Sequence, residues 1–156
     1  MAHRFTHRNL PQQLLKARDA LMANFRPILS HYDLTEQQWR ILRALDEHGQ
    51  LEPREICALC QILSSSMAGI LARMEEIGYV QRQRVAADHR RVLVSLALKG
   101  DALIDEMAPL IELQYQYLEQ AIGKRLLESL SDALQGFVDA QSRPVRRVEL
   151  PPATLT

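Results

Sequence analysis

The segment 85–96 carries a cluster of charged side chains whose chemistry suits contact with phosphate groups. Its polar quartet, Asp88-His89-Arg90-Arg91, lies between two runs of residues that are typical of β-strands. From Gly78 to Gly100, five lysine and arginine residues stand against a single acidic residue, although the net charge of the chain is zero. This local excess of positive charge indicates an anionic partner; a solvated basic hairpin is the alternative.

A second candidate contact surface precedes this segment. Ser64-Ser65-Ser66 stands where a helix is expected to start, and Gly69 and Arg73 follow in the same helix. Hydroxyl groups at a helix start can donate to phosphates or base edges, a glycine allows close approach, and an arginine can reach a phosphate or a guanine. The alternative is that Ser64 only caps the helix and Arg73 is only a surface charge. For Ser64 the two roles are compatible.

Cys57 and Cys60 have the spacing of a metal-binding or redox pair. A zinc site needs about four ligands, and no second Cys/His pair has a suitable spacing, so we expect no metal. Cys60 shares a helix face with Ile56, which favours a place in the core, and a thiol sensor is the alternative. The sequence has no phosphate-binding glycine loop, His-Glu metal motif or nucleophile elbow, so it predicts neither an enzyme nor a cofactor.

Length and composition indicate a single domain in a reducing compartment. The chain has 156 residues, of which 47% are hydrophobic, and this suits one core. No apolar run approaches the roughly 18 residues of a membrane span, and no apolar segment follows the basic N-terminus. Two cysteines so close in sequence are no secreted disulfide framework. We therefore expect a cytoplasmic protein with no membrane partner.

The pattern of apolar residues predicts a mainly helical chain with one short β-ribbon. Thr35 and Gln38 form a capping box at one helix start, Pro53 suits the first position of another helix, and Gly49 and Gly78 suit helix ends. The segment after Arg143-Pro144 is expected to be a mobile tail. Helices are expected at about 12–29, 35–48, 53–60, 64–77, 101–122 (bent at Pro109) and 124–139, and strands at 79–85 and 92–96.

Three short helices followed by a basic two-stranded ribbon are the order of a winged helix-turn-helix. In that arrangement one helix fills the major groove of DNA, and the ribbon reaches over the backbone to a neighbouring groove. The expected fold class is therefore mainly α with a small β-wing.

The segment from Gly78 onward resembles the wing signature of the MarR family of bacterial regulators. It reads Gly78-Tyr79-Val80-Gln81-Arg82, five further residues, Asp88-His89-Arg90-Arg91, Val92-Leu93-Val94-Ser95-Leu96 and Gly100. Residues 63–74 resemble the recognition helix of the family, and the resemblance covers about residues 10–140. Ala97 replaces a usual threonine and Gln81 a frequent acid. Within the family, residues 67–74 look most like the repressors of homoprotocatechuate (4-hydroxyphenylacetate) degradation.

The resemblance implies a homodimeric repressor of an aromatic-catabolism operon, which binds a pseudo-palindromic operator in double-stranded DNA. A small aromatic acid, with homoprotocatechuate or 4-hydroxyphenylacetate as candidates, would release it from the operator. The implied regions are residues 1–33 (N-terminal helix, dimerisation), 34–98 (winged helix-turn-helix lobe), 99–141 (C-terminal helices, dimerisation) and 142–156 (tail).

Individual roles follow from the same resemblance. Arg90, at the tip of the ribbon, would enter the minor groove, where narrow A·T tracts concentrate negative potential. Asp88 would pair with Arg82 and hold the loop in shape. The remaining candidate phosphate contacts in the ribbon are Arg84, His89 and Arg91.

The ligand site is expected on the first two helices. An arginine can bind a carboxylate through two hydrogen bonds, and Met22 and Trp39 can pack on an aromatic ring. An equally good alternative makes these residues an arginine at the dimer interface, a solvated histidine and a core tryptophan. The candidate ligand-binding residues are Arg18, Met22, His31, Trp39 and Arg40.

Two rival functions remain at this point. A cysteine-based redox regulator would respond to peroxide through Cys57 or Cys60. A helical protein-interaction module would use the basic ribbon on an acidic protein partner rather than on DNA.

Overall fold

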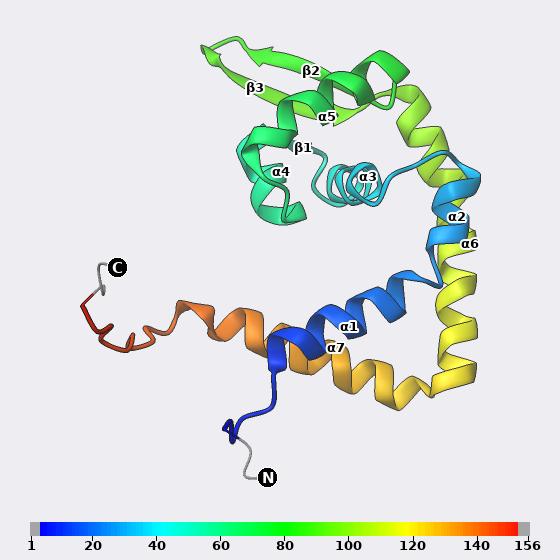
Figure 1. Cartoon of the computed structure of the whole chain (residues 1–156). Coiled ribbons are helices and arrows are strands. Elements are labelled where there is room, and N and C mark those ends of the chain that lie inside the picture. Colours follow the sequence, from blue (N-terminus) through cyan, green and yellow to red (C-terminus); the bar gives the residue numbers. More distant parts are fainter. Residues whose placement is uncertain (1–3, 153–156) are drawn as a thin grey trace. The chain divides into compact units, whose positions relative to one another are not determined.

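A computed structural model describes residues 4–152, so the first three residues and residues 153–156 of the expected tail lie outside the described residues. The chain divides into an N-terminal unit that ends at Gln114 and a C-terminal unit that begins at Tyr115. The elements in Figure 1 are α1 (Leu10–Met22), α2 (Arg26–His31), α3 (Glu36–His48), β1 (Gln50–Leu51), α4 (Pro53–Cys60), α5 (Ser64–Ile77), β2 (Val80–Val85), β3 (Asp88–Leu96), α6 (Leu98–Ile122), α7 (Lys124–Asp139) and a 3₁₀ turn (Ala140–Ser142).

The hydrophobic core of the N-terminal unit forms around α3. This helix lies between α4, α5 and the sheet on one side and α2 and α6 on the other (Figure 1). Burial of these apolar side chains is the main stabilising contribution to such a unit. The largest fully buried side chains are Leu29, Ile41, Leu42, Leu45, Ile56, Leu71, Met74, Val80, Val94 and Met107.

The predicted start of α3 is confirmed. The Thr35 hydroxyl accepts a hydrogen bond from the Gln38 backbone N–H at 3.1 Å, and the Gln38 side chain accepts one from the Thr35 N–H at 3.0 Å. Gly49 ends the helix with a φ of 76°, a conformation that suits glycine. The helix that begins at Pro53 also has a capping box, formed by Glu52 and Glu55.

The single helix expected at about 12–29 is wrong, because the chain turns at Ala23–Phe25 and forms two helices, α1 and α2. The side-chain amide of Asn24 donates to the carbonyls of Ala20 (3.0 Å) and Leu21 (3.3 Å), which replaces bonds of a continuing helix. Pro27 then lies in the first turn of α2, where its lack of an N–H removes no hydrogen bond from the helix.

The expected cap of α5 is also wrong by one residue. Leu63 occupies the N-cap position, and no side-chain capping bond is formed there. Ser64, Ser65 and Ser66 therefore lie within the first turn, and all three are exposed. Since Ser64 does not cap the helix, its hydroxyl is available for another partner.

The β-ribbon is longer than expected and belongs to a three-stranded antiparallel sheet with the order β1-β3-β2. The two-residue strand β1 was not predicted, because so short a segment has no recognisable alternation. Strand β3 begins at Asp88 rather than at Val92, so Ala86 and Ala87 form the tip and the polar quartet starts the return strand. Arg90 is thus beside the tip and not at it.

Helix α6 passes through Pro109 without interruption, and the bend expected there stays a prediction. Near its start, Gly100 packs directly on the backbone that leads into β2. A Cβ atom at this position would lie 2.0 Å from the carbonyl oxygen of Tyr79. This close approach gives a physical reason for the glycine of the wing signature.

We predict that Gly100→Ala lowers the free energy of unfolding by about 2–3 kcal/mol, because the backbone must move to admit the methyl group. Gly69→Ala is the matched control: this helical glycine has open space around its Cβ position, so alanine should add about 1 kcal/mol through helix propensity. Urea denaturation followed by circular dichroism measures both. Equal stability of Gly100→Ala and the wild type would contradict the close packing.

Candidate nucleic-acid interface

Helix α5 has one buried and one exposed face. Met67, Leu71 and Met74, spaced by four and three residues, are at most 3% exposed and pack into the core. The exposed face carries the predicted contact residues. These residues are Ser64, Ser65, Ser66, Gly69 and Arg73. Their side chains form no hydrogen bond or ion pair with another described residue, so this face is free to contact a partner.

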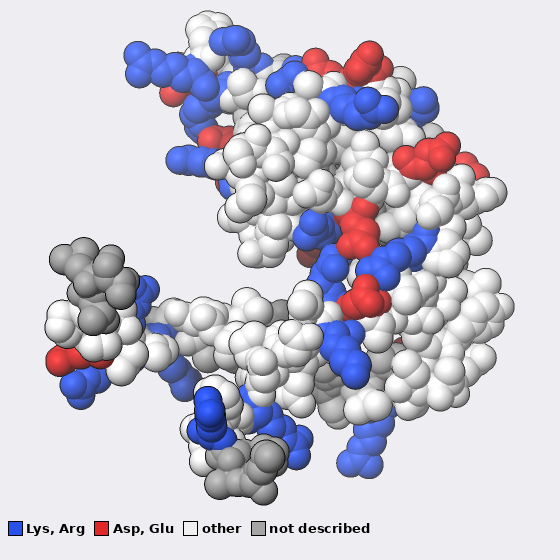
Figure 2. Space-filling model, in the orientation of Figure 1, with Lys and Arg blue, Asp and Glu red and all other residues white. Residues whose placement is uncertain are grey.

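Strands β2 and β3 form a wing (residues 80–96) beside α5, and basic side chains gather on it. Figure 2 shows blue side chains projecting from this end of the N-terminal unit, which Figure 1 identifies as the tip of the wing. Arg90 and His89 are exposed, and within the described residues their side chains have no polar partner. The wing therefore presents positive charge that the protein itself does not neutralise. The exposed wing arginines are Arg82, Arg84, Arg90 and Arg91.

The predicted ion pair between Asp88 and Arg82 is wrong. Arg82 instead pairs with Glu75 on α5, seven residues earlier in the chain. This ion pair ties the base of the wing to α5. The Asp88 carboxylate accepts a hydrogen bond from the backbone N–H of Arg90 at 3.1 Å. The short side chain of aspartate readily accepts a hydrogen bond from the backbone N–H two residues later, and this local bond shapes the start of β3.

Arg84 and Arg91 also have partners within the protein. Arg84 donates to the backbone carbonyl of His89 at 3.0 Å, across the end of the ribbon. Arg91 forms an ion pair with Glu52, just before α4, and this carboxylate raises the pKa of the Arg91 guanidinium. The expected phosphate contacts of Arg84 and Arg91 stay predictions, whereas the Arg90 guanidinium has no polar partner within residues 4–152.

Two of the predicted ligand residues, Trp39 and Arg40, line a cavity of about 260 Å³ between α3 and α4. The Nε atom of Arg40 is buried and has no hydrogen-bond partner among the described residues, which is uncommon for a guanidinium. Arg43 lies one helical turn after Trp39, and its guanidinium carbon is 5.9 Å from the centre of the indole ring. The full lining is Trp39, Arg40, Arg43, Ala44, Glu47, His48, Leu59 and Cys60.

Arg43 was missed by the sequence interpretation. The available signal was its four-residue spacing from Trp39, which places the two side chains on one face of a helix. An arginine beside an aromatic ring, next to a second arginine with an unsatisfied donor, offers charge and a flat surface to an aromatic anion.

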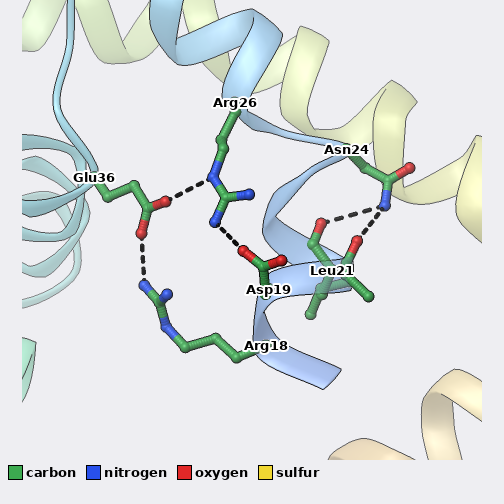
Figure 3. A network of polar contacts seen from close by, with 7 residues as sticks. Arg18, Asp19, Leu21, Asn24, Arg26 and Glu36 are labelled. Carbon is green, nitrogen blue, oxygen red and sulfur yellow. Dashed lines mark hydrogen bonds and ion pairs between the residues drawn. The ribbon is translucent and has the colours of Figure 1, made fainter. Parts of the chain in front are cut away.

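The other three predicted ligand residues do not line this cavity. Arg18 donates to Glu36 at 2.7 Å, Met22 packs against the core, and His31 is exposed with its ring edge-on to Tyr32. Arg18 belongs to a network in which Arg26 bonds Glu36 at 2.9 Å and Asp19 at 2.7 Å (Figure 3). This network joins α1, α2 and the first turn of α3.

Arg18 and Arg26 hold the pKa of the Glu36 carboxyl below its usual range, because both guanidinium groups donate to it. Asp19 and Glu36 raise the pKa of Arg26 in turn. The role of Arg18 visible in this structure is therefore a tie between helices.

Cys60 lies in an environment that disfavours an activated thiol. Cys60 is buried, and its Sγ lies 3.4 Å from the carbonyl oxygen of Arg40, to which the thiol donates. Burial raises the pKa of the Cys60 thiol, which disfavours the reactive thiolate. Cys57 is half-buried and free. Among the described residues, no group of three or more His, Cys, Asp or Glu side chains is arranged to hold a metal ion.

No single helix within residues 4–152 is long and apolar enough to cross a membrane. Helices α4 and α5 together would have the length and composition, but the chain bends by 109° at the break between them.

Helices α4 and α5 with a basic wing define the class of winged helix-turn-helix proteins. Residues 32–91 match the MarR family. The chain is 38% identical to the HTH-type transcriptional regulator FarR of Neisseria gonorrhoeae, over 82% of this chain and 88% of that protein. This chain therefore belongs to the MarR family of transcriptional regulators, as its wing signature predicted.

Two further comparisons bear on the subgroup. The chain is 37% identical to the homoprotocatechuate degradative operon repressor of Escherichia coli, over 85% of this chain and 89% of that protein. It also resembles the crystal structure of NadR in complex with 4-hydroxyphenylacetate, with a TM-score of 0.78 and 36% identity over 88% of this chain and 97% of that one. The predicted likeness to repressors of homoprotocatechuate degradation is confirmed.

We predict that Glu36→Gln lowers the Tm by a few degrees at pH 7, because two charge-assisted hydrogen bonds are weakened. Because the pKa of Glu36 is lowered in the folded state, its charge stabilises the fold fully at pH values above the ordinary carboxyl pKa of 4.5. This contribution is lost as the pH falls through the pKa of the folded state. The Tm difference from the wild type should therefore shrink progressively below about pH 4.5.

Glu128→Gln is the control for this measurement. Its ion pair with Lys124 is long (3.8 Å) and exposed on both sides, so the Tm should hardly change. A Tm difference for Glu36→Gln that is constant from pH 7 to pH 3 would show that the charge of Glu36 does not stabilise the fold.

Proposed function

We propose that this protein is a homodimeric repressor that binds a pseudo-palindromic operator in double-stranded DNA. The observation that carries the proposal is the presence of two exposed surfaces in one unit: one face of α5, and the wing, whose Arg90 side chain has no polar partner among the residues that the structure describes. Helix α5 has the dimensions and small side chains to enter a major groove, and the wing offers a cation to the adjacent minor groove. Phosphates would supply the missing counter-charge.

A second copy of the chain is the partner that best explains the apolar surface of the terminal helices. None of the residues of α7 is buried, although Leu126, Leu130, Leu134 and Phe137 recur at the spacing of one helix face and are 40–57% exposed. Helix α1 likewise exposes Leu10, Leu14 and Leu15. In a dimer, α1, α6 and α7 would cover these side chains and hold two recognition helices about one DNA turn, ~34 Å, apart.

The ligand that suits the cavity between α3 and α4 is a small aromatic carboxylate. Arg43 and the orphan donor of Arg40 can bind the carboxylate, while Trp39 can stack on the ring. Two relatives support this ligand class, one named as a homoprotocatechuate operon repressor and one solved with 4-hydroxyphenylacetate. The ligand would lower operator affinity by binding more tightly to a dimer whose recognition helices do not match the operator spacing.

We predict that Arg90→Ala weakens operator binding about tenfold and makes the salt dependence of binding shallower by about one unit of slope, with little loss of stability. The measurement is a gel shift at several fixed salt concentrations, with a duplex that the wild-type protein enriches from a random-sequence pool. If the pool yields no enriched duplex, the proposed DNA-binding function is wrong. An unchanged affinity of Arg90→Ala would exclude only the wing contact.

We predict that 4-hydroxyphenylacetate lowers the operator affinity of the wild-type protein, and that Arg43→Gln raises the ligand concentration required by about tenfold or more while leaving ligand-free DNA binding intact. Trp39 is the only tryptophan of the chain, so its fluorescence reports ligand binding directly.

Arg18→Gln is the matched control, because Arg18 lies outside the cavity and pairs with Glu36. It should leave the ligand response unchanged. If Arg18→Gln removes the response and Arg43→Gln does not, the ligand is bound through Arg18, one of the residues that the sequence predicted, and not through Arg43 in this cavity.

A further inference from the structure

An ion pair connects the wing to the start of α4. The Nε and Nη2 atoms of Arg91 lie 2.6 and 2.5 Å from the Oε1 atom of Glu52. The Glu52 side chain is only 12% exposed, whereas the Arg91 side chain is 54% exposed. Arg54 approaches the other carboxylate oxygen at 3.3 Å but is itself 85% exposed. Arg91 is therefore the firmer of the two partners.

The irregular register of the wing places Arg91 where it can make this contact. Val85 pairs with Asp88, but the preceding residue of β2, Arg84, pairs with Val92. Residues 89–91 of β3 thus have no opposite residues on β2, and they form a bulge in the ribbon. Two bonds hold the bulge: from Arg84 to the carbonyl of His89, and from the N–H of Arg90 to Asp88.

Glu52 is equally fixed on its own side. It occupies the N-cap position of α4, where its backbone carbonyl accepts the Glu55 N–H at 2.9 Å and its own N–H donates to the Glu55 carboxylate at 2.6 Å. Helix α4 is followed by α5, so Glu52 lies at the start of the helix-turn-helix. One residue therefore both begins α4 and holds the wing bulge.

An acid at this place calls for an explanation, because a carboxylate in a DNA-facing lobe repels phosphates and weakens binding. The burial and geometry of Glu52 are consistent with a role in orienting the wing through its ion pair with Arg91. Glu52 pairs with Arg91, whereas the neighbouring Arg90 side chain has no polar partner in the described part of the chain.

We propose that Glu52 and Arg91 are positioning residues for DNA recognition: their ion pair fixes the wing relative to α5 so that Arg90 meets the groove, and Arg91 itself does not bind phosphate. The proposal rests on the proposed DNA-binding function and adds two residues to it, one of which is acidic. It replaces the earlier expectation that Arg91 assists at the DNA backbone.

The experiment compares five full-length variants by fluorescence anisotropy on two duplexes, the enriched one and a scrambled one of equal length. Glu52→Gln and Arg91→Gln break the ion pair, and the double variant completes the cycle. Glu55→Gln is the matched control, because it removes a nearby acidic charge, leaves the ion pair intact, and provides an amide oxygen that can still accept the Glu52 N–H. Arg90→Ala represents a direct contact.

We expect Glu52→Gln and Arg91→Gln each to weaken binding to the enriched duplex by about tenfold, with little change on the scrambled duplex and with an unchanged salt slope. The double variant should be hardly weaker than either single variant. Glu55→Gln should bind as tightly as the wild type or more tightly. Loss of folded protein would lower binding to both duplexes equally, so the ratio of the two affinities separates positioning from stability.

Three outcomes would overturn this proposal and leave the proposed DNA-binding function standing. A salt slope that becomes shallower by about 0.9 in Arg91→Gln would show a phosphate contact. Tighter binding of Glu52→Gln to the enriched duplex would show that the acid only repels DNA. Additive effects in the double variant would show that the pair does not act as one unit. Absence of any duplex enriched by the wild type would remove the proposed function and this inference together.

Discussion

The burial of one face of α5 is the interaction on which the arrangement of the proposed DNA-binding surface depends. The side chains of Met67, Leu71 and Met74 are buried, and burying each of them stabilises the fold by about 1.5–3 kcal/mol. Once these three side chains are packed around α3, the rotation of α5 about its axis is set. The serines, Gly69 and Arg73 are then directed outward without needing any contact of their own.

The charges of the wing are divided between internal and external use. Arg82 and Arg91 are paired with acids that lie on or next to the helix-turn-helix, whereas Arg90 is unpaired among the described residues. Each internal pair neutralises some positive charge on the proposed DNA-binding surface, and each ties the ribbon to a helix or its first residue. A ribbon with every cation free would carry more charge, but its position would be less defined.

Helix α3 connects the candidate ligand cavity to the rest of the N-terminal unit. Its first turn is tied to α1 and α2 through Glu36, its middle turns line the cavity with Trp39, Arg40 and Arg43, and its opposite face packs in the core beneath α5. A ligand that displaces α3 therefore acts on an element that is tied to α1 and α2 and shares its core with α5. The size of any response is limited by the difference in ligand affinity between the two conformations.

The sequence by itself determined the features that depend on neighbours along the chain. The capping box at Thr35, the apolar spacing of α5 and the Gly78–Gly100 signature predicted the winged helix and its family, because helix caps and periodicity are local properties. Tertiary structure decided the partners. The pairing of Arg91 with Glu52, 39 residues away, the pairing of Arg82 with Glu75 instead of Asp88, and the meeting of α3 and α4 at the cavity all depend on strand register and helix packing, which side-chain pattern alone does not encode.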